Sequence, residues 1–158
     1  MSRHPCCLWR AGREDGQISV LILGLFVIAA MLIVGGVDVT AAQLARVRLI
    51  DAADAIALDA ADALDEQAGY AGGLGQGIAL TPTSVVNAAQ AHLAARPAPD
   101  GVSAWRLLPG TGTADGQSAT VVLEGVVDLP ITGGMLEALG RTVTIQVQSR
   151  ATAPLRQP

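Results

Sequence analysis

Acidic side chains recur along residues 51–66, and closely spaced carboxylates can bind a metal ion or act as a general acid and base. They are Asp51, Asp54, Asp59, Asp62, Asp65 and Glu66. Calcium sites take their ligands from a turn with glycine and backbone carbonyls, which a helix does not offer. A row of carboxylates on a helix is usually a solvated face, with electrostatic docking as the second interpretation. We therefore expect no metal ligand and no catalytic site in this row.

The histidines and cysteines do not complete a catalytic or metal-binding set. The chain has two of each: His4, His92, Cys6 and Cys7. A lone adjacent cysteine pair with no nearby histidine motif is a weak metal signal, and His92 fits a partly exposed structural histidine on a helix. No Ser-His-Asp or Cys-His arrangement can be assembled from these residues. The prediction is a protein that is not an enzyme and has no cofactor, metal or small-molecule substrate.

The acidic row lies on a segment that favours a long helix. Residues 39–67 contain neither Gly nor Pro and are rich in alanine, the best helix former. At 100° per residue the apolar side chains fall on one face opposite the acids. The predicted helix-packing face consists of Ile50, Ala53, Ala57, Ala60 and Leu64. This face must be covered by the chain's own C-terminal domain, by a partner helix, or by both.

Residues 16–38 precede this helix and predict a transmembrane helix. Ile18 to Val37 is an apolar run in which Ser19 is the only polar side chain. At about 1.5 Å per residue the run is roughly 30 Å long, the thickness of the hydrocarbon core of a bilayer. It exceeds the apolar region of a cleaved signal peptide, about 7–15 residues, and no good cleavage site follows it. An uncleaved signal anchor is favoured over a signal peptide.

Charges before the run predict its orientation. Arg3, Arg10 and Arg13 lie in the tail of residues 1–15, and the positive-inside rule places such residues in the cytoplasm. The C-terminal part is then extracytoplasmic. It contains no cysteine, so no disulfide is expected there.

The remaining chain predicts a small domain. Five glycines in residues 68–77 end the long helix, and residues 68–80 are expected to be a linker. Residues 81–158 begin with a helix capped by Thr81 and Pro82. Alternating patterns then predict strands over 102–108, 118–129 and 142–152, with a short helix over 131–140. The fold class is α+β: a transmembrane helix continuing into a long helix, then a small antiparallel sheet in a pilin-like arrangement.

The charge of the chain limits its partners. The net charge is −4 and all ten basic residues are arginines, spread along the chain. No basic patch for nucleic acid results. The lipid bilayer and other membrane-associated proteins remain as partners.

Two stretches resemble a known family. "GQISVLILGLFVIAAMLIVGGVDV" leading into "RVRLIDAADAIALDAA" resembles the N-terminal segment of TadE/TadG-like proteins of the Flp, or tight-adherence, pilus machinery of bacteria. The final "VDLPITGGMLEALGRTVTIQVQSRATA" is similar to the closing strand, short helix and strand of that family. The matching positions are Gly16, Asp38, Arg48, Ala52, Ala53, Asp54, Ala55, Ala57 and Leu58.

The resemblance implies a single-pass protein of the bacterial cell membrane that assists pilus assembly or secretion. It would act as an accessory or minor-pilin-like component, through helix packing and contact with other apparatus proteins. Leu21 stands five residues after Gly16, where substrates of the prepilin peptidase carry Glu, so processing is not expected. The alternative is an anchored extracellular binding or envelope protein unrelated to pili.

Overall fold

The computed structural model describes residues 15–71 and 80–152, and the side chains within 18–62 and 80–152. The expectations for the tail of residues 1–15, for Cys6 and Cys7, and for most of the linker of residues 68–80 lie outside this range.

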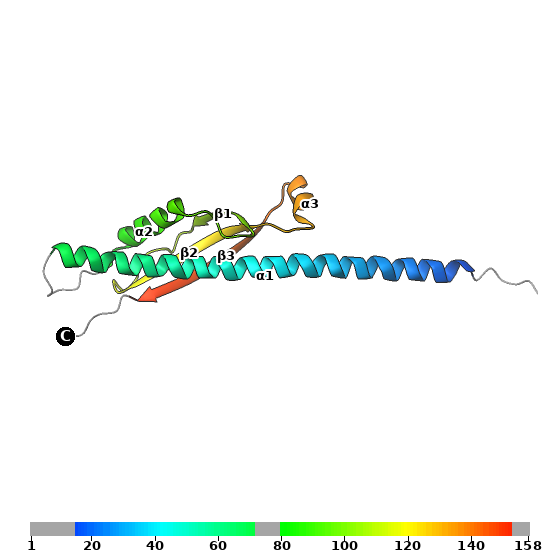
Figure 1. The fold of residues 1–158 in the computed structure, drawn as a ribbon, viewed down its shortest axis with the longest axis horizontal. Helices are drawn as coiled ribbons and strands as arrows, with labels where there is room; N and C mark the ends of the chain where they lie inside the picture. The colour runs from blue at the N-terminus through cyan, green and yellow to red at the C-terminus, as the bar shows by residue number, and fades with distance from the viewer. Residues whose placement is uncertain (1–14, 72–79, 153–158) are drawn as a thin grey trace, which may run out of the picture. The chain divides into compact units, whose positions relative to one another are not determined.

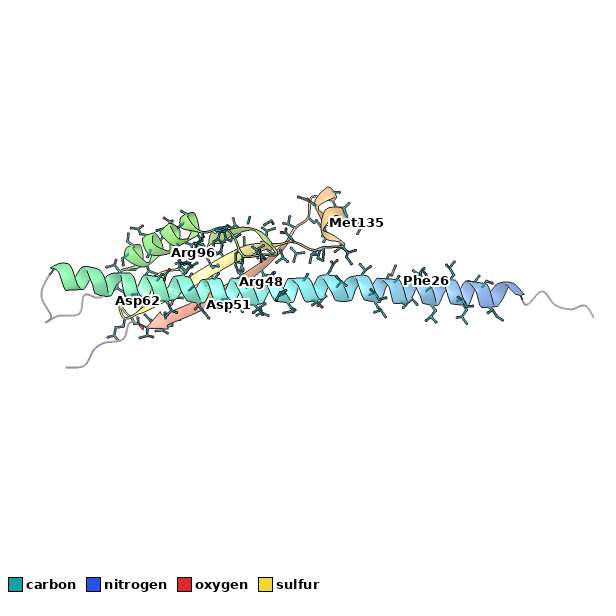
Figure 2. The ribbon with its side chains drawn as sticks, viewed as in Figure 1. Phe26, Arg48, Asp51, Asp62, Arg96 and Met135 are labelled. Atoms are coloured by element: carbon teal, nitrogen blue, oxygen red, sulfur yellow. The ribbon has the colours of Figure 1, made fainter. Side chains whose placement is uncertain are left out.

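Helix α1 (Asp15–Ala71) contains the apolar run and the alanine-rich segment in one helix. The chain divides into two units at Gly36, so that residues 15–36 belong to the first and Val37 begins the second. No side chain between Ile18 and Gly36 is buried. Phe26, for example, is 69 % exposed (Figure 2). Within the described residues, α1 is the one helix long and apolar enough to cross a membrane.

The second unit contains a sheet of three antiparallel strands in the order β1-β2-β3 (Figure 1). The strands are β1 (Val102–Leu107), β2 (Ser118–Val127) and β3 (Val143–Thr152). In the central strand, Leu123 pairs with Leu107 on one side and with Val147 on the other. The register of β1 shifts between Val102 and Ala104, which is typical of a bulge at a sheet edge.

The core lies between one face of this sheet and the second half of α1. Alternate residues of β2 are buried, which is the pattern of a sheet packed on one side. The core cluster comprises Leu49, Ala53, Ile56, Ala57, Ala60, Ala61, Leu80, Val85, Ala89, Ala119, Val121, Leu123, Val147 and Ala151. Three strands alone form a marginal sheet, so the packed helix is what stabilises it.

Helix α2 (Pro82–Ala95) adds two buried residues to the same core, Val85 and Ala89. Its start is a capping box: the Ser84 backbone N–H donates to the Thr81 hydroxyl at 3.2 Å, and the Thr81 N–H donates to the Ser84 hydroxyl at 3.2 Å. The predicted Thr81 cap is therefore confirmed, with Ser84 as its reciprocal partner.

Helix α3 (Gly133–Ala138) connects β2 to β3 and contains no buried residue. It ends in a Schellman motif, in which the Arg141 N–H donates to Leu136 O and the Gly140 N–H donates to Glu137 O. Gly140 has φ +66°, a conformation that glycine adopts readily. Gly140 lies past the end of the helix, as predicted, and the helix itself is shorter than the predicted range 131–140.

The observed elements agree with an α+β fold of one long apolar helix followed by a small antiparallel sheet. The three strands end within two residues of their predicted bounds. The second unit joins the alanine-rich helix and the C-terminal domain, which the sequence analysis described as separate segments.

Gly125 on β2 leaves room for the side chain of Leu49 on α1. A Cβ atom at this position would lie 2.9 Å from Leu49 Cδ2 and 3.0 Å from Val102 Cγ1. We expect Gly125→Val to lower the free energy of unfolding by about 1–3 kcal/mol, because the added methyl groups overpack a core without free space. Denaturant unfolding of the full chain in detergent, followed by circular dichroism, measures the change.

The matched control is Thr144→Val, which places the same side chain on the exposed face of β3. The combination of Gly125→Val with Leu49→Ala should be less destabilised than the sum of the two single changes, since the smaller side chain makes room. Additive losses would show that Leu49 is not what Gly125 accommodates.

Candidate interaction surface

The predicted helix-packing face is occupied by the chain's own domain. Ala53, Ala57 and Ala60 are fully buried in the core cluster, and Ile50 is half-buried against it. The side chain of Leu64 lies outside the described residues. Of the two covers weighed for this face, the C-terminal domain is the one present. These alanines are therefore covered by the chain's own sheet in the described residues.

A different face of α1 remains exposed, and we call it the outer ridge. Its residues are Leu44, Val47, Asp51, Asp54, Leu58 and Asp62, which all are exposed and fall within an arc of roughly 80° at 100° per residue. Figure 2 shows Asp51 and Asp62 on the second half of α1, which follows the apolar run. Leu44, Val47 and Leu58 are about half exposed although they are large and aliphatic. The outer ridge thus combines aliphatic side chains with carboxylates.

The acidic row divides in the structure. Asp51, Asp54 and Asp62 are exposed as predicted, and the side chains of Asp65 and Glu66 lie outside the described residues. Asp59 differs, because its Oδ2 lies 2.6 Å from Nδ1 of His92.

The Asp59–His92 pair connects α1 to α2. The side chain of His92 is 6 % exposed, so it is more buried than the sequence analysis expected, whereas that of Asp59 is 57 % exposed. The described residues contain no group of three or more His, Cys, Asp or Glu side chains that could hold a metal ion. The structure therefore gives this pair a role in holding the two helices together.

The three family-motif positions lie apart and make different contacts. Arg48, labelled in Figure 2, donates a hydrogen bond of 2.9 Å from Nη1 to the backbone oxygen of Asp100, so it holds the turn before β1. Asp54 is exposed on the outer ridge. Asp38 is buried. No single site forms from them.

Asp38 binds the loop that leads into α3. Its Oδ1 accepts a hydrogen bond of 3.0 Å from the Ile131 N–H, and its Oδ2 accepts 3.0 Å from the Thr132 N–H and 2.5 Å from the Thr132 hydroxyl. Hydrogen bonds to a charged acceptor are stronger than neutral ones. A residue of α1 next to the apolar run therefore fixes a segment more than 90 positions later in the chain.

Three large apolar side chains around α3 remain exposed, and we call them the α3 stripe. They are Ile131, Met135 and Leu139, which are 49 %, 63 % and 68 % exposed. They are not among the residues predicted from the sequence to form a site. The sequence signal for them is the spacing of four residues between successive large apolar side chains, which begins in the stretch "ITGG".

Two clusters of polar side chains form hydrogen bonds on or beside the sheet. On its open face the Glu124 carboxylate accepts hydrogen bonds from Gln146 and Arg106, which lower the pKa of Glu124. In the turn before β2, the backbone N–H groups of Gln117 and Ser118 hold the pKa of the Asp115 carboxyl well below its ordinary value of 3.8, and the Ser118 hydroxyl and Arg150 add to the effect.

A shallow hollow between the start of α2 and the turn before β2 offers little chemistry. Its lining includes Pro82, Gly112, Thr113 and Gln148, and no ionisable side chain is among its residues. General acid–base catalysis needs a titratable group within hydrogen-bond reach, so the hollow does not support an enzyme site.

Comparison of the chain with protein-family models, with curated proteins and with solved structures gives no match in any of the three.

Thr132→Val tests the Asp38 contact with minimal change of shape. Removing the hydroxyl donor costs about 1 kcal/mol, which corresponds to roughly fivefold faster exchange of the Ile131 and Thr132 amides. Asp38→Asn should accelerate the same amides further, since it removes the charge that all three bonds share. Hydrogen–deuterium exchange of the full chain measures both, with Thr144→Val as control. Equal exchange in the Thr132 and Thr144 variants would contradict the contact.

Asp115→Asn tests the turn before β2. A folded-state pKa below the unfolded value means that ionised Asp115 stabilises the fold above its ordinary pKa, and that this contribution is lost as pH falls toward the lower folded-state value. The thermal midpoint of the variant should therefore lie below that of wild type at pH of about 6, and the difference should shrink progressively as the pH falls from about 4 toward the lower folded-state pKa. A difference that stays constant across this window would contradict the assignment.

Proposed function

We propose that the protein is a single-pass component of the bacterial cell membrane that belongs to a Flp-type pilus assembly or secretion apparatus. Residues 1–15 would be cytoplasmic and the unit from Val37 onward extracytoplasmic. It would act as an accessory or minor-pilin-like protein through contact with other apparatus proteins. The observation that carries the proposal is α1 itself, whose first part is apolar and unburied and whose second part carries the sheet.

The unburied apolar run supports the membrane part of the proposal. A soluble helix needs a polar face or a protein cover, and the described residues from Ile18 to Val37 have neither. Lipid supplies the missing cover, because an α-helix satisfies its own backbone hydrogen bonds in a bilayer. The arginines of the tail supply the orientation through the positive-inside rule.

The outer ridge supports the contact part of the proposal. The alanine face is filled by the sheet, so a partner protein has to bind elsewhere on α1. Leu44 and Val47 lie one turn apart and Leu58 lies about 16 Å further along the helix, and all three expose apolar area next to carboxylates. The carboxylates of Asp51, Asp54 and Asp62 favour a partner surface with basic residues.

The arrangement of helix and sheet supports the pilin-like part of the proposal. A long helix whose second half packs on a small antiparallel sheet agrees with the TadE/TadG-like resemblance of the two ends of the chain. The alternative, an anchored envelope protein unrelated to pili, shares the span and the domain and differs in its partners.

Reporter fusions test the topology. A reporter that is active only outside the cytoplasm should be active when fused after Pro158 and inactive when fused before Ser2, because Arg3, Arg10 and Arg13 resist translocation. The reverse pattern would contradict the orientation and the extracytoplasmic domain.

Variants of the outer ridge test the contact. Val47→Glu and Leu58→Glu place a charge on exposed positions, so the fold should survive while co-purification with the secretion ATPase and platform proteins falls at least about tenfold, as for loss of a central apolar contact. Thr144→Glu on the open face of the sheet is the matched control. Unchanged pili after deletion of the gene would favour the envelope alternative, and unchanged co-purification in both ridge variants would exclude this surface.

A further inference from the structure

We propose that α3 binds the surface of the lipid bilayer through the α3 stripe of Ile131, Met135 and Leu139. The inference rests on the membrane span of the proposed function and not on the pilus assignment. It adds a second contact with lipid, made by the folded domain.

The α3 stripe has no cover within its own domain. Its three residues are among the exposed large apolar side chains, and α3 contributes no buried residue to the core. Met135 lies within α3, Ile131 lies in the turn before the helix and Leu139 is the residue that caps its C-terminal end, so the three exposed side chains surround one short helix. Glu137 follows Met135 by two positions, which is 200° around the helix and therefore on the opposite side. The segment therefore has an apolar side and a polar side, and both are exposed.

The position of α3 identifies lipid as the occupant. Asp38 holds the Ile131 and Thr132 amides and the Thr132 hydroxyl by hydrogen bonds of 2.5–3.0 Å. Asp38 directly follows Val37, the last residue of the apolar run. When that run spans the hydrocarbon core, Asp38 lies at the membrane–water interface, and the segment bound to it lies there too.

The side chains near α3 are of the kinds found at the membrane–water interface. Apolar residues of an amphipathic segment are buried about 5–10 Å into the boundary of headgroups and acyl chains. Arg141, two positions after Leu139, is exposed and can reach lipid phosphate while its aliphatic part stays in the boundary. Figure 2 shows Met135 on α3, outside the packed core of the sheet and α1.

Fluorescent labelling of the full chain in vesicles tests the proposal. The protein carries Cys6→Ser and Cys7→Ser and one new cysteine, Met135→Cys, labelled with an environment-sensitive dye. It is reconstituted into phosphatidylcholine and phosphatidylglycerol vesicles with lipids that carry a shallow or a deep spin-label quencher. The expected result is that the shallow quencher reduces Met135 fluorescence at least several-fold more than the aqueous quencher iodide does.

Three control positions make the outcome decisive. Glu137→Cys lies on the opposite side of α3, and Thr83→Cys lies at the start of α2, near the other end of β2; both labels should be quenched mainly by iodide. Phe26→Cys lies in the apolar run, and its label should be quenched by the deep spin label. Asp38→Asn combined with Met135→Cys should reduce shallow quenching, because α3 is released.

Each other outcome overturns the proposal in a distinguishable way. A Met135 label that behaves like the Thr83 label places α3 in water. A Met135 label shielded from both quenchers places it against protein, such as a second copy of the chain. A Phe26 label that iodide quenches removes the membrane span, and the proposed function falls with the inference.

Discussion

The contact between the alanine face of α1 and β2 is the constraint on which the rest of the domain depends. A three-stranded sheet with one apolar face needs a cover, and that cover is made of buried apolar side chains. Ala53, Ala57 and Ala60 on α1 supply them, and Gly125 on β2 leaves room for Leu49. α2 then completes the core through Val85 and Ala89, and its His92 pairs with Asp59.

This contact decides which surfaces are left for partners. The alanine face of α1, which the sequence pattern marks most strongly for packing, is used within the chain. The surface of α1 that remains exposed is the outer ridge, where aliphatic residues are mixed with carboxylates. The same logic applies to the sheet. Its open face carries the Arg106–Glu124–Gln146 row, in which each polar group has a partner, and offers little apolar area.

Asp38 shows how one buried carboxylate can connect distant parts of a chain. An ionised group without partners is costly to bury, and here the amides of Ile131 and Thr132 and the Thr132 hydroxyl supply the hydrogen bonds. In return the turn before α3 is held in place, and α3 itself contains no buried residue. The domain is thereby fastened to α1 through the core around Leu49 and Ile56, through the contacts of Arg48 and Asp59, and at Asp38.

The sequence by itself determined the elements, because each depends on local patterns. The apolar run up to Val37, the Thr81 cap, the glycine at position 140 and the alternation of β3 all act over a few residues. Only the tertiary structure decided what covers the alanine face, that His92 meets Asp59, and that Asp38 meets Thr132. Those pairs are separated by 33 and 94 positions. Such contacts arise from how the helix, sheet and loops pack, and no local periodicity encodes them.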